Sequence, residues 1–203
     1  MTSGTSGTSG TTGTSRTTGT SETPTETKGT TAPLPNSGVR IRKMTRSDWP
    51  VVREIFTEGI ESGNATFEPS APAWEQFDAT RLKDHRLVAE AEGRILGWAA
   101  VSAISSRAAY AGVVEHSIYV AGEARGLGVG KALLRALITS TEEAGIWTIQ
   151  ASVFPENEAS LRLHVAEGFT VVGRRNRIAR MPLGPLAGQW RDTLMIERRS
   201  ATV

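Results

Sequence analysis

The sequence has no cysteine, which excludes disulfides, thiolate nucleophiles and thiolate metal sites. Only three histidines occur, scattered along the 203 residues, so we expect no bound metal. No apolar run approaches the roughly 18 to 20 residues that cross a bilayer, and the N-terminus lacks the features of a secretion signal. Basic and acidic residues are interleaved, with a net charge of +2. We therefore expect a cytoplasmic protein without a membrane or nucleic-acid partner, whose chemistry comes from carboxylates, histidines, arginines and the backbone.

Large side chains are nearly missing from the first 31 residues, which are about four-fifths Thr, Ser and Gly. Such a segment cannot bury enough apolar surface to offset the entropy lost on ordering. Pro33 and Pro35, followed by Asn36, Ser37 and Gly38, mark its end. The composition predicts a disordered tail over residues 1–38 and one domain over 39–203.

Hydrophobic patterns in residues 39–203 change repeatedly between the period of a strand and that of a helix. The predicted strands are 39–44, 86–92, 95–102, 112–120, 146–153, 169–175 and 192–197. The predicted helices are 45–62, 74–85, 129–144 and 157–167. This order predicts an α/β fold with a sheet of mixed direction, helices on both faces, and a meander in the second to fourth strands.

A glycine-rich turn, Arg125-Gly126-Leu127-Gly128-Val129-Gly130, lies between a predicted strand and a predicted helix. Glycines let the backbone approach a ligand closely, and free N–H groups at a helix start bind phosphate. The spacing fails the Walker pattern, which needs glycine where Arg125 stands, and fails the dinucleotide pattern, which needs glycine at Lys131. A tight connection without a ligand is the alternative interpretation.

The spacing that fits is Arg-x-x-Gly-x-Gly, which resembles the acetyl-CoA pyrophosphate loop of the GNAT (Gcn5-related) N-acetyltransferases. The resemblance spans residues 39–199 and is strongest for the phosphinothricin N-acetyltransferase branch. The branch is indicated by Glu115 in VEHSIYV, Asn157 in FPENEAS, His164 in LRLHVAEGF, and Trp190-Arg191-Asp192. The resemblance implies a mixed, mostly antiparallel central sheet, acetyl-CoA as co-substrate, and a homodimer.

Acetyl transfer to an amine requires a base for the amine and a proton for the departing thiolate. Glu115 is the candidate base, because a carboxylate in so apolar a strand is costly unless it is paired or used. An ion pair with Arg107 is its structural alternative. His164 is the candidate acid, with a hydrogen-bonded structural histidine as the alternative. His85 and His116 are expected to be structural or surface residues.

The resemblance also assigns binding residues. The turn from Arg125 to Gly130 corresponds to the pyrophosphate site, and the backbone of Ile118, Tyr119 and Val120 to the strand edge that pairs with pantetheine. Asn157 resembles the residue that contacts the pantetheine arm, and asparagine is also a preferred N-cap.

For the substrate, Arg107 and Tyr110 match positions that bind its anionic group, and arginine offers a planar fork to a carboxylate. Phe67 resembles an aromatic pocket wall, with core packing as the alternative. A second basic residue that the branch often has is replaced by Ser105. Trp190 is interpreted as a core or dimer contact.

These residues favour an acetyl-CoA-dependent N-acetyltransferase. Its expected substrate is the α-amine of a small amino acid or an amino-acid-like toxin of the phosphinothricin, methionine sulfoximine or arsinothricin type. Two alternatives stay open: a GNAT enzyme that acetylates a protein N-terminus, a lysine or a polyamine, and a non-catalytic acyl-CoA sensor. The sensor needs neither Glu115 nor His164.

Overall fold

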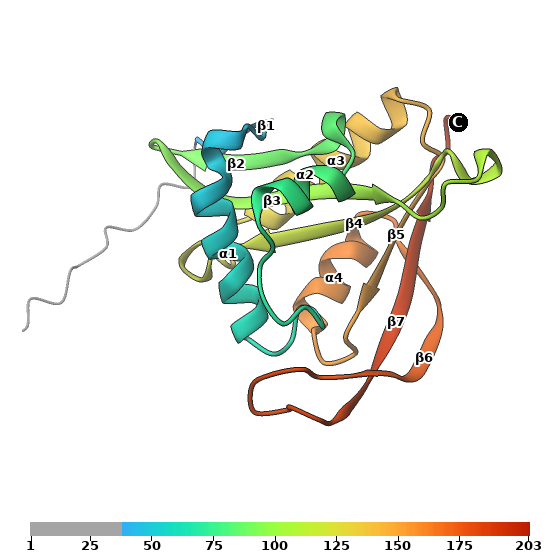
Figure 1. The fold of residues 1–203 in the computed structure, drawn as a ribbon. Helices are drawn as coiled ribbons and strands as arrows, with labels where there is room; N and C mark the ends of the chain where they lie inside the picture. Colours follow the sequence, from blue (N-terminus) through green and yellow to red (C-terminus); the bar gives the residue numbers. More distant parts are fainter. Residues whose placement is uncertain (1–37) are drawn as a thin grey trace, which may run out of the picture. The chain divides into compact units, whose positions relative to one another are not determined.

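One seven-stranded sheet organises the part of the chain that the computed structural model describes, residues 38–203 (Figure 1). The strands are β1 (Arg40–Lys43), β2 (Leu87–Ala91), β3 (Arg94–Ala103), β4 (Val113–Val120), β5 (Thr148–Val153), β6 (Thr170–Arg180) and β7 (Trp190–Arg199). Their spatial order is β1-β2-β3-β4-β5-β7-β6. The predicted tail over residues 1–38 lies almost entirely outside the described residues.

The helices are α1 (Trp49–Glu61), α2 (Trp74–Thr80), α3 (Val129–Glu143) and α4 (Glu158–Ala166). Short 3-10 turns lie at η1 (Arg46–Asp48), η2 (Lys83–His85), η3 (Ala108–Tyr110) and η4 (Gly122–Ala124). The order of strands and α-helices is the predicted one. The last predicted helical turn of 74–85 is instead η2, because the chain is already extended at Leu82.

Most strand pairs are antiparallel, and β4 with β5 is the one parallel pair among the described strands. The predicted meander is confirmed, since β2, β3 and β4 pair in sequence. The parallel pairing covers only Val113 to Glu115 on β4. Beyond Glu115 the two strands diverge, and α4 lies in the opening (Figure 1). This divergence leaves the following residues of β4 unpaired on that side.

Helices cover both faces of the sheet. Helix α1 packs on β3 and β4, while α3 packs on β1 to β4 from the other side. The core contains the buried stripe of α3, formed by Val129, Leu133, Leu134 and Leu137, and aromatic side chains around Trp98. Both helices contact β4, so this strand is packed from both faces of the sheet. Within residues 38–203, no helix is long and apolar enough to span a membrane.

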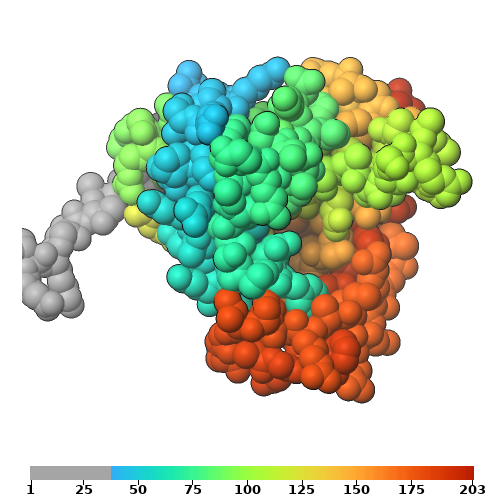
Figure 2. All heavy atoms as spheres, viewed as in Figure 1, coloured from blue at the N-terminus to red at the C-terminus, as the bar shows by residue number. Residues whose placement is uncertain are grey.

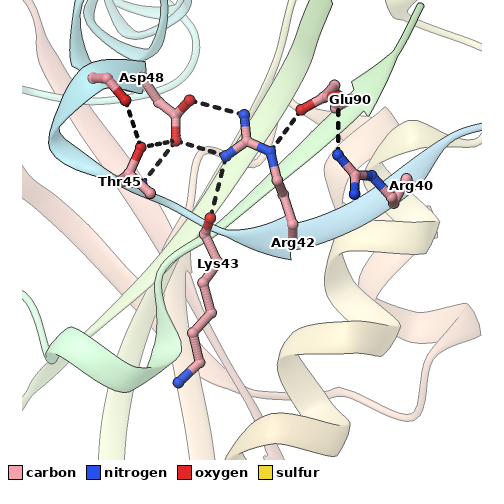
Figure 3. Close-up of polar contacts among 7 residues, drawn as sticks. Arg40, Arg42, Lys43, Thr45, Asp48 and Glu90 are labelled. Carbon is pink, nitrogen blue, oxygen red and sulfur yellow. Dashed lines mark hydrogen bonds and ion pairs between the residues drawn. The ribbon is translucent and has the colours of Figure 1, made fainter. Parts of the chain in front are cut away.

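An ion-pair network fixes the start of the domain (Figure 3). Asp48 accepts two hydrogen bonds from Arg42, at 2.7 and 2.8 Å, and one from the backbone N–H of Thr45 at 2.7 Å. The Arg42 Nε also donates to Glu90 on β2 at 2.6 Å. The network joins β1, β2 and the start of α1, and it includes the capping contact between Thr45 and Asp48.

Asp48→Asn should destabilise the domain at neutral pH. The Arg42 guanidinium, followed by the hydrogen bonds from Thr45, lowers the pKa of Asp48 to about 2. A shift of this size from the usual value near 3.9 corresponds to about 2 kcal/mol. This stability is present above the unfolded pKa and is lost as the pH falls toward 2. Urea unfolding should therefore separate the two proteins at pH 7 and much less at pH 2.5; an equal gap at both would contradict the assignment.

Candidate active site

A first cavity of about 480 Å³ lies where β4 and β5 diverge. It is lined by residues of both strands, of α4, and of the loop that follows α1. Its charged and titratable members are Glu68, Arg81, Glu115, His116, Tyr119 and His164. We call it the β4–β5 cavity. Its mouth is the hollow between the loop after α1 and the C-terminal strands in Figure 2.

A second cavity of about 530 Å³ lies against the glycine-rich turn. We call it the glycine-turn cavity. Gly126 and Gly128 have φ angles of +77° and +80°, a left-handed conformation that favours glycine. Gly128 is the N-cap of α3, so free N–H groups of the first helical turn face this region. Arg125 and Lys131 add positive charge to its lining.

The two cavities share part of their walls, including Ala65, Ile118, Tyr119, Asn157 and His164. The unpaired edge of β4 runs from one cavity to the other. A phosphate held at α3 and a reactive group held beside Glu115 therefore fit one elongated ligand. No atom lies within 4 Å of a Cβ built on Gly126 or Gly128, so a diphosphate has room to approach the turn. The residues present thus fit acetyl-CoA.

Glu115 is the last β4 residue that pairs with β5, opposite Gln150. Its half-buried side chain lines the β4–β5 cavity, where Ser152 Oγ lies 3.4 Å from Oε1. Within residues 38–203 no ion pair engages Glu115, so the alternative pairing with Arg107 is not formed. An unpaired carboxylate in a cavity is suitably placed to accept a proton.

His164 and His116 form a buried pair, with their Nε2 atoms 3.2 Å apart. His164 Nδ1 lies 2.7 Å from the Ser160 carbonyl oxygen, which can only accept, so in the neutral ring Nδ1 carries the proton. His164 Nε2 is then an acceptor and His116 Nε2 its donor. Burial lowers the pKa of both imidazoles, and for His116 the neighbouring His164 adds to this. The pair is therefore neutral at pH 7.

This arrangement bears on both interpretations of His164. Both of its ring nitrogens have protein partners, as the structural alternative expects, yet the ring also lines both cavities. His164 can exchange a proton only when one of these hydrogen bonds opens. We therefore expect a smaller catalytic contribution from His164 than from Glu115.

Stability should fall as the pH is lowered from 7 to 5. Burial lowers the pKa of His85 as well, so all three histidines are held neutral in the fold. The unfolded chain takes up protons below its histidine pKa near 6.5, and the folded chain takes up fewer over the same range, so stability is lost in this window. His116→Gln should make the dependence shallower, by up to about 1.4 kcal/mol per pH unit. Thermal melts at several pH values measure this, and an unchanged slope in the variant would refute the neutral pair.

Asn157 has the predicted N-cap role at α4. Its Oδ1 accepts a hydrogen bond from the Ser160 backbone N–H at 3.2 Å, and its Nδ2 donates to the Asn64 carbonyl at 3.0 Å. The side chain thus joins α4 to the loop after α1 and lines both cavities. The predicted contact with the pantetheine arm stays a prediction.

The predicted binding residues lie in three different places: the glycine-turn cavity, the β4–β5 cavity and the exposed loop before β4. Ile118, Tyr119, Val120, Arg125, Gly126, Gly128, Val129 and Gly130 line the glycine-turn cavity, while Leu127 does not. Phe67 lines the β4–β5 cavity and packs edge-on against Phe154 at 4.9 Å. Arg107 and Tyr110 are exposed on the loop before β4, where they stack on each other and reach neither cavity lining. Their substrate contacts stay predictions.

Trp190 is 43% exposed at the start of β7, and the Arg180 guanidinium lies 4.7 Å from its ring centroid. Core packing is therefore excluded for this side chain in the chain as described.

Sequence analysis missed several cavity residues, among them His116 and Arg81. His116 was expected to be a structural or surface residue. Its contact with His164 depends on how β4 and α4 pack together, which the sequence does not show. Arg81 follows α2 directly and lines the β4–β5 cavity. The available signal was its position four residues after the buried Phe77, which places both on one side of a helical turn.

The acetyltransferase (GNAT) family model matches residues 45–169. This match covers more than half of the chain, and the protein belongs to the GNAT acetyltransferase family. The fold expected from the resemblance, a mixed and mostly antiparallel sheet with helices on both faces, is confirmed.

The relatives that this chain resembles indicate which branch of the GNAT family it belongs to. The phosphinothricin N-acetyltransferase of Alcaligenes faecalis is 34% identical over 165 residues, covering 78% of this chain and 81% of that protein. The L-amino acid N-acyltransferase MnaT of Escherichia coli is 30% identical, covering 77% and 91%. The solved phosphinothricin acetyltransferase from Sinorhizobium meliloti, in complex with AcCoA, has a TM-score of 0.71 at 30% identity, covering 80% and 88%. The chain is an acetyl-CoA-dependent N-acetyltransferase of the phosphinothricin acetyltransferase-like branch.

Proposed function

We propose that this enzyme acetylates the α-amine of a small amino acid or an amino-acid-like toxin. The observation that carries the proposal is the unpaired Glu115 carboxylate, which lies where the β4–β5 cavity meets the free edge of β4. The relatives named for phosphinothricin, methionine sulfoximine and L-amino acids support this substrate class.

In the proposed reaction, the glycine turn and Arg125 hold the diphosphate, and the free edge of β4 at Ile118 to Val120 holds the pantetheine arm. Acetyl-CoA supplies the activated thioester. Glu115 accepts a proton from the substrate ammonium, directly or through a water, and leaves a neutral amine as the nucleophile. A β4 backbone N–H near the thioester stabilises the charge that develops on its oxygen.

The departing thiolate requires a proton from the other side of the cleft. We assign this step to His164, whose ring lines both cavities. When its hydrogen bond to His116 opens, the neutral Nε2 takes up the proton that the substrate nitrogen loses after its attack, and passes this proton to the thiolate. The His164 ring is neutral at pH 7 and is hydrogen-bonded at both nitrogens. A water in the cavity can therefore supply the proton in its place. The non-catalytic sensor is disfavoured, since a sensor has no use for a carboxylate beside the thioester site.

The proposal includes a cytoplasmic location, where acetyl-CoA is available, and a homodimer. The edge strand β6 supports the dimer, because it exposes Val171, Val172 and Ile178 and an exposed apolar edge favours pairing with another chain. Analytical ultracentrifugation tests the dimer directly.

Thiol release from acetyl-CoA tests the substrate class. The panel contains L-methionine sulfone, L-methionine sulfoximine, phosphinothricin, free L-amino acids, a polyamine and a peptide with a free N-terminus. We expect turnover with at least one free amino acid or analogue at a kcat/KM well above that of the peptide and the polyamine. Faster turnover of the peptide or the polyamine would favour the alternative GNAT function instead.

A further inference from the structure

Arg81 is a cation in the wall of the β4–β5 cavity, and its guanidinium has no hydrogen-bond or ion-pair partner among the described residues. Its Nε atom is buried and has no hydrogen-bond partner, and no ion pair engages its guanidinium within residues 38–203. The guanidinium carbon lies 5.8 Å from the Phe77 ring centroid, which leaves the polar edge of the group free. Burying a cation without a partner costs free energy, unless a bound ligand supplies the missing anion.

Neighbouring arginines show that the lack of a partner is specific to Arg81. Arg86 is bound by Asp78, at 2.5 Å, and by two backbone carbonyls. Arg191 is bound by Glu156 at 2.8 Å and by the Gly63 carbonyl and Asn64. Both of these guanidinium groups therefore serve the fold. Arg81 instead lines the cavity, where the two carboxylates of the lining are those of Glu68 and Glu115.

Arg81 and Glu115 line the same cavity, and their charges interact. Burial lowers the pKa of its guanidinium, and the charges of Tyr119, Glu68 and Glu115 act in the opposite direction. The group stays charged, as arginine does in proteins. The β4–β5 cavity thus presents a cation and the base Glu115 to the same ligand.

We infer that Arg81 binds the α-carboxylate of the amino-acid substrate while Glu115 faces its amine. An α-amino acid carries both groups on one carbon, and the cavity offers the guanidinium of Arg81 to its carboxylate and the carboxylate of Glu115 to its amine. The planar fork of arginine binds a carboxylate with two parallel hydrogen bonds. This inference rests on the proposed function and assigns to Arg81 the role that sequence reasoning gave to the exposed Arg107.

The same charges define substrate specificity. Among the described residues that line the β4–β5 cavity, Arg81 is the one arginine or lysine, and two carboxylates accompany it. This single cation pairs with the α-carboxylate of the substrate. An anionic group on the substrate's side chain then has no cation to pair with. The cavity therefore favours amino acids with uncharged side chains, such as L-methionine sulfone, over phosphinothricin with its second anionic group.

The kinetic test compares L-methionine sulfone with its carboxamide in wild type, Arg81→Lys and Arg81→Gln. A charge-assisted contact corresponds to roughly 10- to 100-fold in affinity. Arg81→Gln should raise KM by this factor for the free acid and change little for the carboxamide, whereas Arg81→Lys should lie between. Arg46→Gln is the matched control, because Arg46 is exposed and pairs with Glu75 at 2.8 Å outside the cavity. An equal loss on acid and carboxamide, or a selective loss in Arg107→Ala instead, would overturn the inference.

Calorimetric binding of L-methionine sulfone without acetyl-CoA separates this inference from the proposed function. Binding that weakens 10- to 100-fold in Arg81→Gln supports the inference even if the wild type acetylates no amino acid. Turnover by the wild type with unchanged binding in Arg81→Gln overturns the inference and leaves the function intact. No binding to the wild type overturns the inference outright. A higher kcat/KM for phosphinothricin than for L-methionine sulfone would refute the assigned specificity.

Discussion

Glu115→Gln should lower kcat by roughly 10² to 10⁴-fold, the usual contribution of a positioned acid or base. The substitution keeps the size of the side chain and one oxygen that can accept a hydrogen bond, and it removes the ability to accept a proton. The affinity for acetyl-CoA should change little, because Glu115 lines the β4–β5 cavity and not the glycine-turn cavity. Steady-state kinetics with a saturating amino acid, together with calorimetry of acetyl-CoA, measures both quantities.

Glu68→Gln is the matched comparison, since Glu68 is the other carboxylate in the lining and is more exposed. Its loss should lower kcat far less than the loss of Glu115. The expected ranking is Glu115→Gln, then His164→Ala, then Glu68→Gln. A larger effect at Glu68 would identify Glu68, on the loop after α1, as the base. A wild-type kcat in Glu115→Gln would mean that catalysis depends on substrate positioning alone.

Gly128→Glu should abolish measurable binding of acetyl-CoA. Gly128 is the N-cap of α3 with φ of +80°, so a carboxylate there would face the free N–H groups that are expected to hold a diphosphate. Repulsion between the two anions and loss of the site both oppose binding. Calorimetry with acetyl-CoA, after circular dichroism has verified the fold, gives the result.

Gly128→Asn separates charge from backbone strain. Asparagine tolerates the left-handed region better than most residues, and the space around a Cβ at this position is open. This variant should retain most of the affinity for acetyl-CoA. If Gly128→Asn lost binding as completely as Gly128→Glu, backbone strain would explain both results and the anion site would lose its support.

The fold was predictable because its signals are local. The alternation in 112–120 and the apolar stripe of α3 are visible in the sequence, and β4 and α3 form there. The C-terminal strands were predicted too short: β6 extends to Arg180 and β7 begins at Trp190. Here a bulge at Arg177, whose N–H donates to Asp192 at 2.7 Å, interrupts the alternation that marks a strand.

The candidate site was predictable only in part, because its decisive features are not local. Glu115 and the glycine turn stand out in the sequence, but the end of the β4–β5 pairing at Glu115 is a property of the sheet. The roles of the two candidate arginines are also not visible in the sequence. Whether Arg81 or Arg107 faces the cavity depends on how α2 and the loop before β4 fold back, and on Asp78 already being engaged by Arg86.

The central claim is that acetyl transfer to an α-amine takes place beside Glu115. Its most direct test is NMR identification of the product after incubation with ¹³C-acetyl-CoA and L-methionine sulfone, in wild type and Glu115→Gln at matched acetyl-CoA occupancy. The account predicts a ¹³C-acetyl group on the α-nitrogen in the wild type and a rate lower by at least about 10² in the variant. Acetyl-CoA binding without any acetylated amino acid across the substrate panel, or equal rates in both proteins, would contradict it.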